Sequence, residues 1–114
     1  MRAGKLDRRI QFQRYTVDDD GFSEVKIWAD HGSEIWASKV DLKDWEKLRG
    51  DGASAELTSR FRVRSSSFTR GLTAKDALKY RGVTFEIFGI KELGRNEYLE
   101  ITAGAEVSNG NSQA

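Results

Sequence analysis

Alternating hydrophobic and polar residues dominate the chain and predict β-strands. Between Arg8 and Tyr15, Ile10 and Phe12 alternate with polar residues, which is the period of a strand that buries one face. Further strands are predicted at 23–29, 35–40, 58–65, 79–90 and 98–102, although the segment 35–40 has apolar residues on both faces and leaves its register open. Short strands separated by turn residues predict a mainly β fold, a small antiparallel β-barrel or sandwich.

The segment 58–65 alternates most strictly. Phe61 and Val63 point to one face and are expected to be buried, while the other face holds Arg60, Arg62 and Arg64. This arginine face has two interpretations: it contacts phosphates, or it meets acidic side chains of a neighbouring strand or subunit. The net charge of +1 favours the second interpretation, because a nucleic-acid-binding domain is usually basic as a whole.

The segment 79–90 predicts a hairpin whose turn lies near Arg81-Gly82. Its second strand carries apolar residues on both faces. Strict alternation assigns Val83, Phe85 and Ile87 to the inner face, and assigns Phe88 and Ile90 to the outer face. Apolar residues on an outer face are candidates for contact with another chain.

A short helical insertion is predicted within residues 41–57. Leu42, Trp45 and Leu48 share one face, Asp41 is a candidate N-cap, and Gly50 ends the pattern. A second helical piece is predicted at 53–57. The Trp45 stripe packs either on its own domain or on another subunit, and we favour the second. The candidate subunit or partner interface therefore comprises Trp45, Leu48, Phe88, Ile90, Arg60, Arg62 and Arg64.

The acidic run Asp18-Asp19-Asp20-Gly21 predicts a turn. Its carboxylates lack the spacing and the distal Glu of a calcium loop, so an acidic hairpin tip is favoured over a cation site. Residues 1–103 are expected to form one domain, because 114 residues are hardly enough for two. From Gly104 the chain is rich in Ser, Asn, Gly and Gln, so 104–114 is expected to be a flexible tail.

Composition excludes several kinds of chemistry. The chain has no cysteine and a single histidine, His31, which removes thiolate zinc sites, cysteine nucleophiles and a conventional catalytic triad. The sequence contains neither a Gly-rich phosphate loop nor paired acids spaced for acid–base catalysis. No apolar run approaches the roughly 18 residues of a membrane span. We therefore expect no enzyme activity, no cofactor, no metal and no membrane partner.

An ordered set of short motifs is spread over Met1 to Thr102. The motifs, in chain order, are Gly4-x-Leu6-x-x-Arg9-Ile10-x-Phe12-x-Arg14, Trp36-Ala37, Val40, Glu46, Ala55-Glu56-Leu57-Thr58, Arg60-Phe61-Arg62-Val63-Arg64, Leu72-Thr73-x-Lys75-Asp76, Tyr80-Arg81-Gly82-Val83-Thr84-Phe85-Glu86-Ile87 and Gly94-Arg95-x-x-Tyr98-Leu99-x-Ile101. Taken together, this set resembles the head–tail joining proteins of tailed bacteriophages, also called head-closure, stopper or adaptor proteins.

The resemblance implies a small β-rich structural protein of a phage or prophage particle. Such a protein forms a homo-oligomeric ring below the portal or adaptor, closes the DNA-filled head and provides the surface on which the tail docks. Its expected partners are further copies of itself, the portal or adaptor above, a tail protein below, and packaged DNA near the channel. It would be assembled in the host cytoplasm and become part of the virion. The alternative function is a small β-barrel nucleic-acid-binding module that uses the arginine face.

Overall fold

The computed structural model describes residues 5–42 and 55–107. This part of the chain consists mainly of β-strands, as the sequence predicts. The elements in chain order are β1 (Arg8–Asp19), β2 (Glu24–Asp30), β3 (Ile35–Asp41), β4 (Ala55–Arg64), the short 3-10 helix η1 (Thr69–Gly71), β5 (Ala77–Tyr80), β6 (Val83–Leu93) and β7 (Tyr98–Val107).

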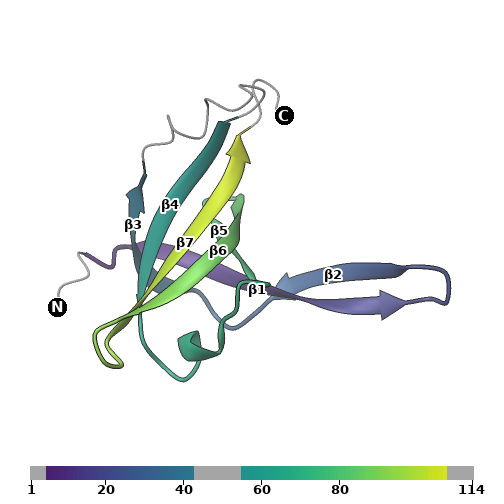
Figure 1. Cartoon of the computed structure of the whole chain (residues 1–114), viewed down its shortest axis with the longest axis horizontal. Coiled ribbons are helices and arrows are strands. Elements are labelled where there is room, and N and C mark those ends of the chain that lie inside the picture. The colour runs from purple at the N-terminus through teal and green to yellow at the C-terminus, as the bar shows by residue number, and fades with distance from the viewer. Residues whose placement is uncertain (1–4, 43–54, 108–114) are drawn as a thin grey trace.

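The strands form one antiparallel sheet in the order β2-β1-β3-β4-β7-β6-β5. The first half of β1 also pairs with β5, where Phe12 lies opposite Leu78, so the sheet closes on itself. Among the described strands, β2 alone stays outside this closed part, because it pairs only with β1. Together with the second half of β1 it projects as a two-stranded ribbon (Figure 1).

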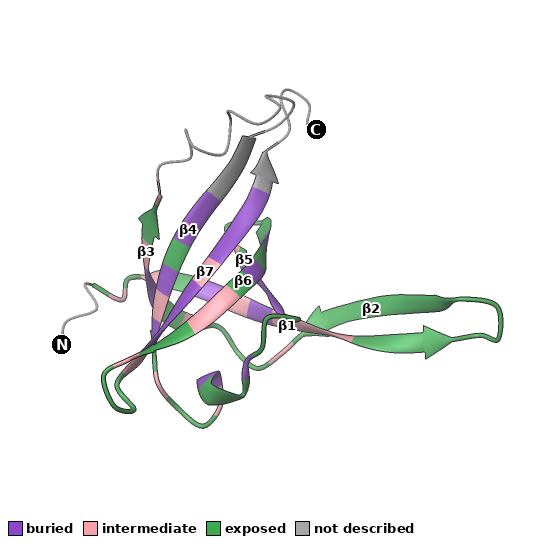
Figure 2. Cartoon of the chain, in the orientation of Figure 1, coloured by how far each residue is buried: buried purple, intermediate pink, exposed green. Residues whose placement is uncertain are grey.

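The core lies inside the closed part of the sheet, as the buried segments in Figure 2 show. Its largest fully buried side chains include Phe12, Phe61 and Phe85, and the rings of Phe61 and Phe85 meet edge to face with centroids 5.2 Å apart. Phe61 and Val63 are both 0% exposed, so the predicted face of this strand is confirmed. The alternation of apolar and polar residues in β4 therefore predicts its buried face correctly.

The predicted hairpin turn at Arg81-Gly82 is also confirmed, between Tyr80 at the end of β5 and Val83 at the start of β6. Both turn residues have positive φ, 53° for Arg81 and 78° for Gly82. A two-residue turn with two positive φ angles matches the right-handed twist of the strands that it joins. Glycine makes the second of these angles possible without strain.

The predicted assignment of residues to the two faces of β6 is wrong beyond Ile87. Phe85 and Ile87 are buried as expected, but a β-bulge interrupts the pairing with β7 between Ile87 and Gly89. The bulge adds one residue, Phe88, so the alternation shifts by one position. Ile90 therefore turns inward, lies opposite Ile101 and packs against the core instead of joining Phe88 on the outer face. Val83, predicted to be inside, is exposed at the start of the strand.

The predicted helical insertion falls mostly on residues 43–54, outside the described residues. Its last part is wrong, since residues 55–57 belong to β4 and lie opposite 105–107 of β7. Backbone hydrogen bonding to a long neighbouring strand overrides a weak local helical preference. β7 itself continues to Val107, beyond the expected domain end at 103, and Gly104 and Ala105 are buried. Residues 108–114 of the expected tail lie outside the described residues.

Candidate assembly surface

The ribbon of β1 and β2 is the most exposed element among the described residues. We define the arm as residues 15–28, which run from the pair Tyr15–Trp28 to the pair Asp19–Glu24. Every residue of β2 is exposed, and so are residues 16–19 of β1. Figures 1 and 2 show the arm extending away from the closed part of the sheet. A two-stranded hairpin without a second layer is marginally stable by itself in water.

The tip of the arm is a turn built by aspartate side chains. Asp19 Oδ1 accepts a hydrogen bond from the N–H of Gly21 (2.9 Å), and Asp20 Oδ1 accepts from Phe22 (2.9 Å) and Ser23 (3.1 Å). The backbone N–H groups of Phe22 and Ser23 hold the pKa of Asp20 below its usual value. Gly21 has a φ of 93°, an angle that would strain the backbone of a residue with a side chain. The acidic hairpin tip predicted from the sequence is thus confirmed, displaced by two residues to 20–23.

Large apolar side chains are exposed along the arm. Phe22, at the tip, is 96% exposed, and four others are exposed by roughly half: Val17, Val25, Ile27 and Trp28. Tyr15 and Trp28 face each other across the strands with ring centroids 5.0 Å apart, and Lys26 Nζ lies 4.6 Å from the centre of the Tyr15 ring. Exposed apolar surface of this extent usually marks a contact with another molecule.

An ion pair at the base fixes the direction of the arm. Arg14 Nε and Nη2 each donate to a carboxylate oxygen of Asp76 at 2.9 Å, and Nη2 also donates to the carbonyl of Gly71. The side chain of Asp76 is 2% exposed. Its burial acts to raise its pKa, but the hydrogen bonds from Arg14 and from the N–H of Thr73 outweigh this and lower the pKa below the usual value. The paired carboxylate raises the pKa of Arg14 in turn.

Hydrogen bonds also hold the chain to β1 directly after β2 ends, at the base of the arm. The N–H of His31 donates to the carbonyl of Phe12 (2.8 Å), and Gln11 Nε2 donates to the carbonyl of Gly32 (2.9 Å). Gly32 has φ 77°, and a Cβ there would lie 2.5 Å from the ring of Phe68, so only glycine fits. The ring of His31 also contacts that of Phe68, with centroids 5.0 Å apart. The arm therefore starts from a rigid base.

The arginine face on β4 is engaged within the chain. Arg62 donates to Glu100 of β7, with Nε 3.1 Å and Nη2 3.0 Å from Oε2, and Arg60 Nε lies 4.0 Å from Oε1 of the same carboxylate. Arg64 lies over the ring of Tyr98, 5.8 Å from its centre. The interpretation that these arginines meet an acidic side chain of a neighbouring strand is confirmed for Arg60 and Arg62.

A second polar cluster consists of side chains from β1, β3, β4 and β5. Lys39 Nζ pairs with the carboxylate of Asp41, which also accepts from Ser59 Oγ (2.8 Å). The hydrogen bonds from Lys39 and Ser59 lower the pKa of Asp41. Arg8 Nη1 donates to the hydroxyl of Tyr80 at 2.9 Å. Asp41 therefore ties the end of β3 to β4, whereas the sequence predicted it as a helix cap.

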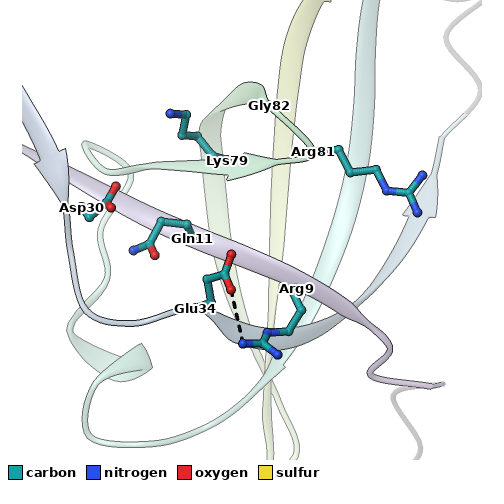
Figure 3. Close-up of a pocket in the computed structure, with 7 residues that line it drawn as sticks. All are labelled: Arg9, Gln11, Asp30, Glu34, Lys79, Arg81 and Gly82. Atoms are coloured by element: carbon teal, nitrogen blue, oxygen red, sulfur yellow. Dashed lines mark ion pairs between the residues drawn. The ribbon is translucent and has the colours of Figure 1, made fainter.

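An open polar pocket of about 390 Å³ lies on the outer side of β1 and β5, beside the base of the arm. Figure 3 shows its lining residues: Arg9, Gln11, Asp30, Glu34, Lys79, Arg81 and Gly82. Arg9 Nη2 lies 3.3 Å from Oε1 of Glu34, and its guanidinium stacks 4.7 Å from the centre of the Trp36 ring. Lys79 and Arg81 form no ion pair with any residue that the structure describes.

Of the predicted interface residues that the structure describes, Ile90 alone turns away from the outer face. Gly89, next to Phe88, and Arg60 both lie opposite Thr102 of β7, so Phe88 and the arginine face are two strands apart. Phe88 is 44% exposed at the bulge of β6, Ile90 faces the core, and the arginines lie on β4. Trp45 and Leu48 lie outside the described residues. The arm was missed as a contact surface, although the apolar alternation at Val25 and Ile27 was visible. The alternating pattern predicts a strand, but it does not show whether another layer covers that strand. Among the described residues, no second layer covers the arm.

The described residues contain no group of three or more acidic or histidine side chains arranged to hold a metal ion. They also contain no helix with the length and apolar character needed to cross a membrane. Fold and surface of the described residues together define the class: a small, mainly β protein with a closed sheet, from which an arm with exposed apolar residues projects.

Comparisons with known proteins identify the family within this class. A family model described as phage head completion protein matches residues 1–107. The chain belongs to this family and is a structural protein of the phage head. A search of curated proteins finds no match.

Two solved structures share the fold. A chain from the virion of a native gene transfer agent particle superposes with a TM-score of 0.75 at 20% identity, covering 92% of this chain and 98% of that one. A protein of Shigella flexneri 2a, solved in solution, gives a TM-score of 0.66 at 23% identity, with coverages of 92% and 96%. At these identities the likeness concerns the fold alone.

Proposed function

We propose that this chain forms a ring in the head–tail connector, where it closes the DNA-filled head and provides a surface for tail docking. The observation that supports this function most directly is the arm, which exposes apolar residues on both faces and at its tip. A protein that acts alone gains nothing from such a surface, whereas a ring subunit needs one for its neighbours. The fold shared with a chain from a gene transfer agent virion is consistent with a role in a particle.

The proposed partners are further copies of the chain, a portal or adaptor protein above the ring and a tail protein below it. Assembly would take place in the host cytoplasm, and the chain would act by contact, not by catalysis. Phe88 remains a proposed partner contact, because the bulge leaves it exposed on the closed part of the sheet. Trp45 and Leu48 remain proposed contacts from the sequence.

Nucleic-acid binding through the arginine face is disfavoured by the structure. Arg60 and Arg62 share the carboxylate of Glu100, so phosphates would have to compete with an ion pair that is already formed. The acidic arm would also repel a nucleic-acid backbone. If packaged DNA lies close to the ring, the contact is expected to be weak and strongly dependent on salt.

In vitro completion of heads tests the proposed function. DNA-filled heads assembled without this protein are mixed with the purified chain and then with tails, and infectious or DNA-transferring particles are counted. We expect the chain to protect the packaged DNA from nuclease and to allow tails to attach. Heads that retain their DNA and accept tails equally well without the chain would contradict the proposal. A salt-dependent gel shift with short DNA tests the alternative on the same sample.

A further inference from the structure

The arm lacks a partner on every side that the structure describes. Its strands pair only with each other beyond Gln13 and Asp30, and the apolar residues Val17, Val25 and Ile27 remain about half exposed. Phe22, at the tip, is almost fully exposed. A hairpin of this kind gains stability when another surface covers it. The rigid base at Arg14 and Asp76 holds it in a fixed direction, as a docking element requires.

The charge of the arm is opposite to that of the rest of the chain. Four acidic residues and Lys26 give the arm a net charge of −3, so the remaining residues carry +4 of the chain's total of +1. Asp19 lies directly opposite Glu24 across the two strands. Like charges in that position destabilise a strand pair. A cationic surface that approached the tip would relieve this repulsion, which indicates the chemistry of the partner.

The same chain offers two cations, Lys79 and Arg81, in a pocket that also holds Asp30 and the ion pair of Arg9 with Glu34. The pocket beside β5 exposes Lys79 and Arg81, neither of which forms an ion pair among the described residues (Figure 3). The arm cannot reach the pocket of its own chain. Asp30, at the base of the arm, already lines that pocket, and the six steps along the strand from Asp30 to Glu24 carry the tip roughly 20 Å away at about 3.4 Å per step.

We propose that the arm of one copy docks on the next copy, with its acidic tip against Lys79 and Arg81 of that copy's pocket. This inference rests on the proposed function, since it names the contact that joins neighbours in the ring. The two surfaces differ, so the contact is head to tail, and repetition by rotation closes a ring. Phe22 and the apolar flanks of the arm bury surface on the neighbour, while the charges set the register of the contact.

Charge reversal tests the proposed contact in solution. Asp18 and Glu24 form no side-chain hydrogen bond in the described chain, so Asp18→Lys with Glu24→Lys changes the net charge of the arm from −3 to +1 and keeps its turn. Lys79→Glu with Arg81→Asp reverses the pocket, and Asp before Gly82 suits a turn with positive φ. Lys5→Glu with Arg95→Glu is the matched control for the pocket variant, with the same change of net charge at exposed positions that do not line the pocket.

Sedimentation velocity at low salt gives the readout. Each reversed variant alone is expected to self-associate at least about tenfold more weakly than the wild type, because the arm variant loses the acidic excess of its tip and the pocket variant brings two acidic surfaces together. The control variant should associate like the wild type. An equimolar mixture of the two reversed variants should recover association, since each tip then meets a pocket of opposite charge. A mixture that stays as weak as its components overturns the proposal.

Zero-length cross-linking locates the contact. Carbodiimide joins carboxylates to amines, so the wild-type chain should yield links from residues 18–20 or Glu24 to Lys79. In a mixture of isotopically light and heavy chains these links should join different copies. Links confined to one copy, or no link at these residues, overturn the proposal.

The head-completion assay separates this inference from the proposed function. If the reversed variants complete heads as well as the wild type does, the docking proposal is wrong while the connector function stands. If the wild-type chain associates through the arm but completes no heads, the proposed function is wrong and the docking contact stands.

Discussion

Single residues at the base of the arm decide where the arm points. Arg14 is the main partner of the buried Asp76 carboxylate, which otherwise keeps only the N–H of Thr73. We expect Arg14→Ala to lower the free energy of unfolding by about 1–3 kcal/mol, the usual cost of leaving a buried acceptor short of a donor. Urea unfolding measures this loss. Arg70→Ala, which removes an exposed guanidinium bonded only to Ser65, is the control and should change stability little. Equal losses in both variants would contradict the assigned role.

The carboxylate of Asp76 also makes the stability of the folded chain depend on pH. The pKa of Asp76 is lowered in the folded chain, so the unfolded chain binds more protons below its ordinary pKa of about 3.9. The stabilisation is therefore complete above about pH 4 and is lost as pH falls through the folded pKa. We expect Asp76→Asn to be less stable at neutral pH and to lose less further stability on acidification. If the free energies of unfolding of the wild type and of Asp76→Asn fall in parallel as the pH is lowered, Asp76 does not contribute to the pH dependence.

Whole elements differ in how much support they have. β4 and β7 pair over ten residues inside the closed sheet, whereas the arm has no third strand. We expect backbone amides of residues 24–28 to exchange quickly in the isolated chain and to become protected in the assembled particle. Amides of β4 should be protected in both states. Hydrogen exchange before and after assembly measures this difference. Equal protection of the arm in both states would show that nothing covers it.

Local alternation predicted most strands, but it could not predict how they continue. The faces of Phe61 and Val63 follow from a period of two, and the turn at Arg81-Gly82 follows from glycine chemistry. The bulge at Phe88 could not be foreseen, because an inserted residue depends on the pairing with β7. The exposure of the arm was hidden for a similar reason. Val25 and Ile27 alternate as a buried strand would, and only the topology leaves them uncovered.

At the scale of the whole molecule, two phenylalanines separate folding from assembly. Phe61 is 0% exposed in the core, while Phe88 is 44% exposed on the bulge of β6. We expect Phe61→Ala to lower the free energy of unfolding by about 3–5 kcal/mol, the usual cost of removing a fully buried ring. Phe88→Ala should change the stability of the isolated chain by less than about 1 kcal/mol, as exposed substitutions do.

Assembly should rank the same two variants differently. If Phe88 contacts a neighbouring protein in the connector, Phe88→Ala keeps the melting temperature of the isolated chain but reduces head completion, because aromatic anchors dominate the energy of many interfaces. Phe61→Ala should lose head completion only in proportion to the fraction that is unfolded. Thermal melting and the head-completion assay on the same preparations measure both effects. If Phe88→Ala completes heads at the wild-type level, the outer face of β6 is not a partner surface, and the apolar contacts of assembly are then confined to surfaces such as the arm.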